Sequence, residues 1–167
     1  MPLTDDLATI ARQEATLQFS RFSEETAWLL GSRLRQLALS RQHALVIDVR
    51  RFGQPLFYCA LAGTSPDNPV WAQRKANTVA RFHRSSYGMG LELQLKGTTL
   101  ADRFGLTLNE YAAHGGSFPI TIAGTGVIGA VTVSGLPQRD DHQLVVEALC
   151  AETLNDFNSL RLPDAPA

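Results

Sequence analysis

The stretch from residue 114 to residue 135, HGGSFPITIAGTGVIGAVTVSG, constrains the fold of this chain more than any other. It contains two apolar runs, residues 118–123 and 127–133, which are rich in β-branched residues and are separated by a Gly-Thr-Gly turn at residues 124–126. β-Branched side chains suit a pleated, half-buried surface, and glycine adopts positive φ angles without steric cost. The pattern therefore predicts an antiparallel hairpin with a tight turn.

The same stretch contains the spacing G-x-G-x-x-G at Gly124, Gly126 and Gly129. In a dinucleotide-binding site this motif follows a strand and opens a helix. The residues that follow Gly129 are β-branched and predict a second strand, so we exclude a dinucleotide site.

The rest of the chain alternates between helical and strand-like patterns. Residues 87–96 are open to two interpretations, because residues 91–95 alternate as a strand does, whereas a short helix that ends at Gly97 also fits. The order of elements predicts an α/β sandwich (α+β) about one largely antiparallel sheet. Helices are expected over residues 5–18, from the N-cap Ser23 to about residue 40, from the cap Asn68 and Pro69 onward, over residues 99–105, and after the cap Asp140 with Gln143 in a capping box; strands are expected over residues 44–49 and 56–61.

Composition limits the class of protein. A chain of 167 residues with 44% hydrophobic and 19% charged residues suits a single globular domain over residues 1–167, with a frayed tail at 163–167. The net charge of −1 argues against a nucleic-acid footprint, and no apolar run is long enough to span a membrane. The N-terminus lacks a signal-peptide pattern, and Cys59 and Cys150 form no disulfide framework, so we expect a reducing cytoplasm.

Several segments together resemble the haem-degrading domain family, which includes HbpS-like and GlcG-like proteins. The resemblance covers residues 20–160. It implies a profilin-like fold with a five-stranded antiparallel sheet and helices on both faces, assembly into homo-oligomers, and haem or iron binding in some relatives. The Asp-His pair, with Trp71 and Lys75, is similar to an uncharacterised branch of that family. The residues that carry the resemblance are Gly115-Gly116-x-Phe118-Pro119-Ile120, Gly126-Val-Ile-Gly129-Ala-Val-x-Val-Ser134-Gly135 and Asp141-His142.

Two histidines are the candidates for chemistry. His114 precedes the Gly-Gly pair, where it would bind a metal, ligate haem iron or act as a general base, or else only hold its loop through a hydrogen bond. His142 would pair with Asp141 or face a neighbouring subunit. The four histidines show no spacing typical of a metal site, so we expect no dedicated metal centre. Haem iron needs only one or two axial ligands, and His114 is the better candidate for that role.

Glycines near the hairpin suggest a second kind of site. Backbone amides of Gly115, Gly116, Ser134 and Gly135 would form a nest for an anion, with Lys75 and Arg74 on a helix that packs nearby. The alternative is that these glycines only permit close packing of the chain. A carboxylate or phosphate ligand would suit the nest.

Three hypotheses for the function follow. The favoured one is a cytoplasmic, homo-oligomeric protein that binds haem or a small anionic metabolite through Lys75, His114, Gly115, Gly116, Ser134 and Gly135. The second is an enzyme of haem or small-acid metabolism in which His114 or His142 is the acid or base. The third is an oligomeric scaffold or partner-binding assembly without catalysis. Independently of these hypotheses, the core-like spacing of Trp28, Trp71 and Phe82 on helices predicts a place in the core or a subunit interface.

Overall fold

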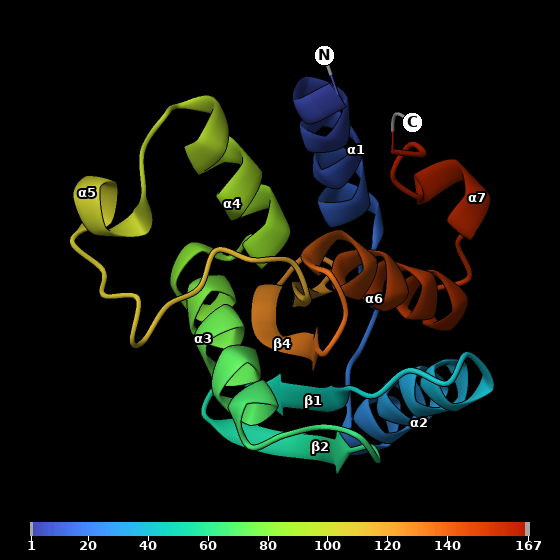
Figure 1. Ribbon diagram of the computed structural model, residues 1–167. Coiled ribbons are helices and arrows are strands. Elements are labelled where there is room, and N and C mark those ends of the chain that lie inside the picture. Colours follow the sequence, from blue (N-terminus) through green and yellow to red (C-terminus); the bar gives the residue numbers. More distant parts are fainter. Residues whose placement is uncertain (1, 166–167) are drawn as a thin grey trace.

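The computed structural model describes residues 2–165 of the chain (Figure 1). Within these residues the chain forms a mixed α/β fold with an antiparallel sheet. Its elements in order are α1 (Pro2–Thr16), α2 (Glu24–Ser40), β1 (Val46–Arg51), β2 (Gln54–Ala60), α3 (Asp67–Phe82), α4 (Ser86–Leu95), α5 (Leu100–Phe104), β3 (Ser117–Ile122), β4 (Gly126–Ser134), α6 (Gln138–Glu152) and α7 (Phe157–Leu160).

The sheet has the strand order β2-β1-β4-β3, and every neighbouring pair is antiparallel. The predicted hairpin of residues 114–135 is confirmed as β3 and β4, and the rejected dinucleotide motif lies in its turn and second strand. The expectation of five strands is wrong for residues 2–165, which form four. Phe19 forms only one parallel bridge to Ile122 at the outer edge of β3, because the chain leaves that edge to reach Ser23, the N-cap of α2.

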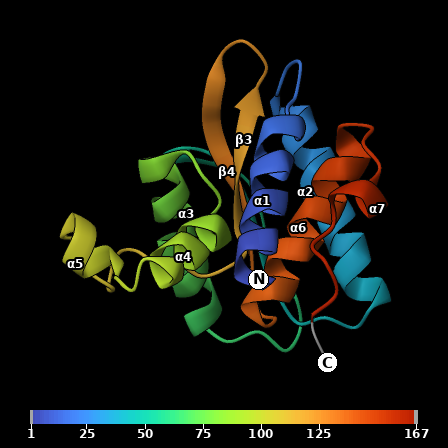
Figure 2. The ribbon, with the colours of Figure 1, turned by 90° about the horizontal axis from the view of Figure 1, so that it is seen from above.

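Helices cover both faces of the sheet, and Figure 2 shows β3 and β4 between α3 on one side and α2 and α6 on the other. The face toward α2 and α6 is apolar and holds the main core, in which β-branched strand residues meet the inner sides of the two helices. The face toward α3 is more polar, since Ser117 Oγ and Thr132 Oγ1 lie 2.8 Å apart there and Thr78 of α3 donates to the carbonyl of Ala112. Polar groups thus gather where α3 crosses the ends of the strands.

The helix boundaries decide one open alternative and correct two expectations. Residues 87–95 are helical, and α4 begins after Ser85, whose side chain accepts a hydrogen bond from the Gly88 amide. The helix α3 starts one residue before Asn68, with Pro66 at the cap position. The helix α6 starts two residues before Asp140, also after a proline, so the predicted capping box does not form.

No helix in residues 2–165 combines the length and the apolar character that crossing a bilayer requires. Residues 166 and 167 of the predicted tail lie outside the described residues. Within the described part of that tail, the carbonyl of Pro163 accepts a hydrogen bond from Arg139. The end of the described chain is therefore tied to α6.

Candidate functional site: a cleft between α3, β4 and α6

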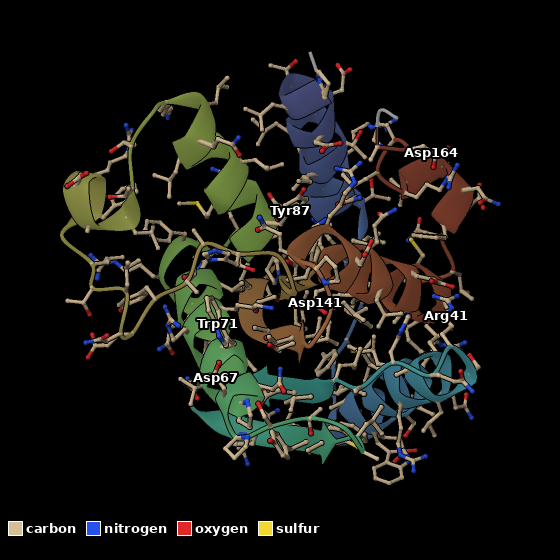
Figure 3. All side chains as sticks on the ribbon, in the orientation of Figure 1. Arg41, Asp67, Trp71, Tyr87, Asp141 and Asp164 are labelled. Atoms are coloured by element: carbon tan, nitrogen blue, oxygen red, sulfur yellow. The ribbon has the colours of Figure 1, made fainter. Side chains whose placement is uncertain are left out.

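A cleft of about 270 Å³ opens where the start of α3, the end of β4 and the start of α6 meet. Figure 3 shows Trp71 on α3 and Asp141 on α6, one from each helix that borders the cleft. We call it the Lys75 cleft. Of the predicted site residues, Lys75, His114, Ser134 and Gly135 line it together. The full lining is Asn68, Trp71, Lys75, His114, Ser134, Gly135, Leu136, Gln138 and Asp141.

A buried ion pair forms the floor of the cleft. Lys75 Nζ donates to Asp141 Oδ2 at 2.9 Å and to the carbonyl of Val133 at 3.2 Å, and the two charged side chains are only 5% and 1% exposed. An ammonium has three donors, so one N–H of Lys75 is left without an acceptor in the described chain. Because the two charges cancel, the floor contributes a hydrogen-bond donor to the cleft without a net charge.

The Asp141 carboxylate is also held by backbone amides. Oδ2 accepts from the Gly135 amide at 3.3 Å and Oδ1 from the Leu136 amide at 3.0 Å. Burial raises the pKa of Asp141, and the Lys75 ammonium and these two amides offset part of that rise. The carboxylate thereby fixes the loop between β4 and α6 against α3.

The Gly-Gly pair is required for steric reasons. Gly116 has φ +134°, and a Cβ atom on it would lie 2.4 Å from the Val133 carbonyl oxygen and 2.8 Å from Lys75 Nζ. A Cβ on Gly115 would lie 2.0 Å from the carbonyl oxygen of Gln138. Neither glycine lines the cleft, but both allow β3 to approach the groups that do.

Two of the four amides expected in an anion nest have internal acceptors. The Gly115 amide donates to Gln138 Oε1 at 3.2 Å, and the Gly135 amide donates to Asp141. The Gly135 amide, which was expected to bind an external anion, therefore binds the carboxylate of Asp141 instead. Ser134 instead offers its hydroxyl, which lines the cleft and makes no hydrogen bond to another residue of the described chain.

Trp71 forms one wall of the cleft and is fixed from three sides. Its Nε1 donates to Asp67 Oδ2 at 3.0 Å, one helical turn earlier on α3. The guanidinium carbon of Arg74 lies 4.3 Å from the ring centroid, a cation–π contact, and the His114 ring meets Trp71 edge-on at 5.2 Å. The indole is thus held in one orientation at the mouth of the cleft.

Beside the cleft, against the Trp71 ring, Arg74 carries a charge that the described chain does not neutralise, although Arg74 is not part of the lining. Arg74 forms no ion pair within residues 2–165, and its buried Nε has no hydrogen-bond partner there. The pKa of His114 is lowered by partial burial and by the nearby cations Lys75 and Arg74, although much of the side chain is exposed. His114 is therefore neutral at pH 7, and its ring makes no hydrogen bond to another described residue.

His142 lies outside the cleft, in spite of its position next to Asp141. Its side chain is only 1% exposed and packs against Tyr87. Its Nε2 lies 2.8 Å from Gln13 Oε1, while Gln13 Nε2 donates to the Leu160 carbonyl. Gln13 is thus the acceptor, which places the histidine proton on Nε2 and leaves Nδ1 without a partner among the described residues. Complete burial, together with the charge of Arg139, lowers the pKa of His142 to about 3.

Sequence reasoning missed two features of the site. The first is the shared helical face of Asp67, Trp71 and Arg74 on α3, which recur at i, i+4 and i+7. The sequence singled out Trp71 and Arg74 separately, but not this row. The second is the pairing of Asp141 with Lys75, 66 residues away along the chain, which no local pattern predicts. The fold alone brings these two residues together.

Known proteins share the fold that holds this cleft. The chain belongs to the family described as "Haem degrading protein HbpS-like", which matches residues 22–150. The UPF0303 protein of Burkholderia thailandensis is 59% identical over 162 residues, which are 97% of this chain and 98% of that protein. The fold is similar to the crystal structure of the Ybr137w protein, with a TM-score of 0.82 and 29% identity over 89% of this chain and 87% of the other. It is also similar to a solved PduOC:Heme complex, with a TM-score of 0.67 and 18% identity over 78% of this chain and 94% of the other.

Proposed function

We propose that this chain is a cytoplasmic, homo-oligomeric ligand-binding protein whose Lys75 cleft holds a small organic anion. The observation that carries the proposal is the convergence of two unused donors on one cavity. The third N–H of Lys75 and the hydroxyl of Ser134 both lack an acceptor in the described chain, and both residues line the cleft. Both groups face the cleft, so an oxygen of a bound ligand would accept hydrogen bonds from them.

The charges around the cleft favour a ligand with a single negative charge. Lys75 and Asp141 cancel, His114 is neutral, and the guanidinium of Arg74 behind Trp71 has no anionic partner in the described chain. A monocarboxylate that also carries a hydroxyl or carbonyl oxygen would match the two donors in the cleft and the positive field of Arg74 beside it. The volume of about 270 Å³ lies just below the range of about 300–1,000 Å³ that is usual for ligand pockets, so the cleft suits a small ligand.

Isothermal titration calorimetry with lactate, acetate and inorganic phosphate tests this proposal. We expect saturable binding of lactate, weaker binding of acetate because it lacks the second oxygen, and weaker binding of phosphate because it is largely a dianion at pH 7.5. Ser134→Ala should weaken lactate binding by about tenfold, the value of one hydrogen bond. Ser40→Ala, which changes an exposed serine at the end of α2, is the matched control and should leave binding unchanged. Absence of saturable binding for all three anions would remove the proposal.

Haem is a second candidate ligand, favoured by the state of His114. An exposed, neutral imidazole without a hydrogen bond in the described chain is suited to be an axial ligand of iron. Membership of the HbpS-like family and the likeness to PduOC, which was solved with haem, support this candidate. The donor chemistry fits, but the cleft is too small to enclose a porphyrin.

A haemin titration followed by absorbance separates the two candidates. Haem ligation predicts a saturable Soret shift in the native protein that disappears in His114→Ala and persists in His43→Ala. Without a specific shift, haem is removed as a candidate and the small anion remains.

The cellular setting and the assembly are also proposals. Cys59 and Cys150 are both free thiols, which is typical of a reducing compartment. Homo-oligomers are what the resemblance to the family implies.

A further inference from the structure

The outward side of α2 carries an exposed stripe that includes a tryptophan. The side chain of Trp28 is 58% exposed, and its ring is held edge-on against Phe57 of β2 at 5.6 Å between centroids. At 100° per residue, the stripe occupies one side of the helix, opposite the residues that α2 buries in the core. Its members, none of them buried, are Glu25, Trp28, Leu29, Ser32, Arg35, Gln36 and Leu39.

Two charges on this stripe have no partner in the described chain. Arg33 on α2 pairs with Glu152, and Arg41 at its end pairs with Glu147, both on α6. Arg35 forms no ion pair within residues 2–165, and neither does Glu25, although the adjacent Glu24 pairs with Arg51. The unpaired acid and the unpaired base lie near opposite ends of the stripe, with Trp28 and Ser32 between them.

The edge of the sheet next to α2 is also open. The strand β2 lies beside α2 at one end of the strand order, and it has no partner on its outer side in residues 2–165 (Figure 1). Residues 54–60 carry no charge, whereas exposed edge strands are commonly protected by lysine or other charges. A groove of about 380 Å³ runs between the helix and this edge, lined by Trp28, Ser32, Arg35, Gln36, Phe57, Tyr58 and Cys59.

We propose that the face formed by α2 and β2 docks a second copy of this chain across a two-fold axis, with the two α2 helices antiparallel. The partner is a second copy because the stripe complements itself. An isologous interface presents the same patch twice, so a contact between the unpaired acid of one copy and the unpaired base of the other occurs on both sides of the axis. This interface would be the contact surface of the homo-oligomer in the proposed function, and it rests on the proposal that the protein is a homo-oligomer.

The register of the two helices follows from the charges. If Glu25 of one copy faces Arg35 of the other, the axis passes near residue 30, and the same operation brings Trp28 opposite Ser32. A large side chain then meets a small one on each side of the axis, which suits packing of ridges into grooves. The acid and the base are ten residues apart, about 15 Å along the helix, so like charges of the two copies stay separated.

Charge reversal tests this arrangement on the full chain, with sedimentation velocity over a concentration series as the readout. Glu25→Arg alone and Arg35→Glu alone should each weaken self-association by on the order of tenfold or more, because each places like charges together. An equimolar mixture of the two variants should associate again, since both pairs are then complementary. Arg12→Glu, at an exposed arginine on α1, is the control and should behave as the native protein does. These surface changes leave the core intact, and circular dichroism of each variant confirms its folding.

The outcomes separate this surface from the proposed function of the cleft. A native protein that is monomeric at every concentration overturns both the surface and the homo-oligomer. An oligomer that neither reversal weakens, or single variants that do not associate when mixed, overturns this surface alone. If the face of α2 and β2 binds a different protein and not a second copy of this chain, the proposed interface is also overturned. Lactate titrations of the same samples report on the Lys75 cleft independently.

Discussion

Replacing Lys75 by methionine tests the buried ion pair on which the cleft is built. Methionine keeps most of the length of the side chain and removes its charge, so the Asp141 carboxylate loses its counter-ion while it remains 1% exposed. Breaking a buried pair by removing one partner typically costs 3–5 kcal/mol. Two backbone amides still donate to this carboxylate, so we expect the lower end, about 3 kcal/mol off the free energy of unfolding.

The cost should depend on pH with a definite sign. Burial raises the pKa of Asp141, and the loss of Lys75 removes a cation that opposed the rise. The variant carboxyl therefore takes up a proton at a higher pH and becomes neutral. A raised carboxyl pKa destabilises the native state increasingly as pH rises above the unfolded pKa of about 3.9. The loss of unfolding free energy in Lys75→Met should therefore be largest at neutral pH and should shrink as pH falls toward 4.

Urea unfolding followed by circular dichroism, at several pH values between 4 and 8, measures this effect. Lys96→Met is the control, because Lys96 pairs with Glu92 on the surface and its loss should cost less than about 1 kcal/mol. In the double variant Lys75→Met/Asp141→Asn no charge is stranded, so its cost should be smaller than the sum of the single costs by at least about 1 kcal/mol. A Lys75→Met cost below about 1 kcal/mol, or one that grows as pH falls, would refute the reasoning.

Three further predictions concern the surroundings of the cleft. Followed through its Cε1 proton by NMR, His114 should titrate with a pKa below 6.5. Arg74→Gln should raise this pKa, because it removes one of the positive charges that lower it; an unchanged or lower pKa would contradict this. Gly116→Ala should destabilise the fold by about 1–3 kcal/mol in urea, whereas Gly53→Ala, with open space around its Cα, should cost little; equal costs would show that the close approach at residue 116 is unimportant. In the unfolded chain His142 takes up a proton near pH 6.5, whereas in the native state burial lowers its pKa to about 3. Native stability should therefore decrease as pH falls from 6.5 to 3, and His142→Leu should make this decrease smaller. An equal decrease in the variant would argue against the role of His142.

The parts of this structure that sequence reasoning reached are those with local causes. The hairpin of β3 and β4 follows from β-branched runs around two glycines, and the start of α2 follows from the cap Ser23, whose side chain accepts from the Thr26 amide. Gly105 ends α5 in the left-handed region, as its position after an apolar helical turn indicates. In each case the residues that decide the conformation are within a few positions of it.

The parts that the sequence left open or missed depend on contacts between distant segments. The alternation of residues 91–95 fits a strand as well as a helix, and only the packing of α4, which buries Leu91 and Leu93 in different clusters, decides for the helix. The fifth strand implied by the resemblance does not form within residues 2–165, where the edge of β3 carries only an isolated bridge to Phe19. His142 follows Asp141 in sequence, yet the helical rotation of 100° between neighbours sends one side chain to the cleft and the other to Gln13 on α1.

The proposed role of the cleft is tested most directly by the indole resonances of the two tryptophans. Trp71 lines the Lys75 cleft and Trp28 lies on the outward side of α2, so a ¹H–¹⁵N spectrum reports on both regions at once, and Trp28→Phe assigns the signals. On titration with lactate, we expect the Trp71 indole N–H signal to shift saturably while that of Trp28 stays in place. A Trp71 signal that does not move, or equal shifts of both signals, would contradict ligand binding in the Lys75 cleft.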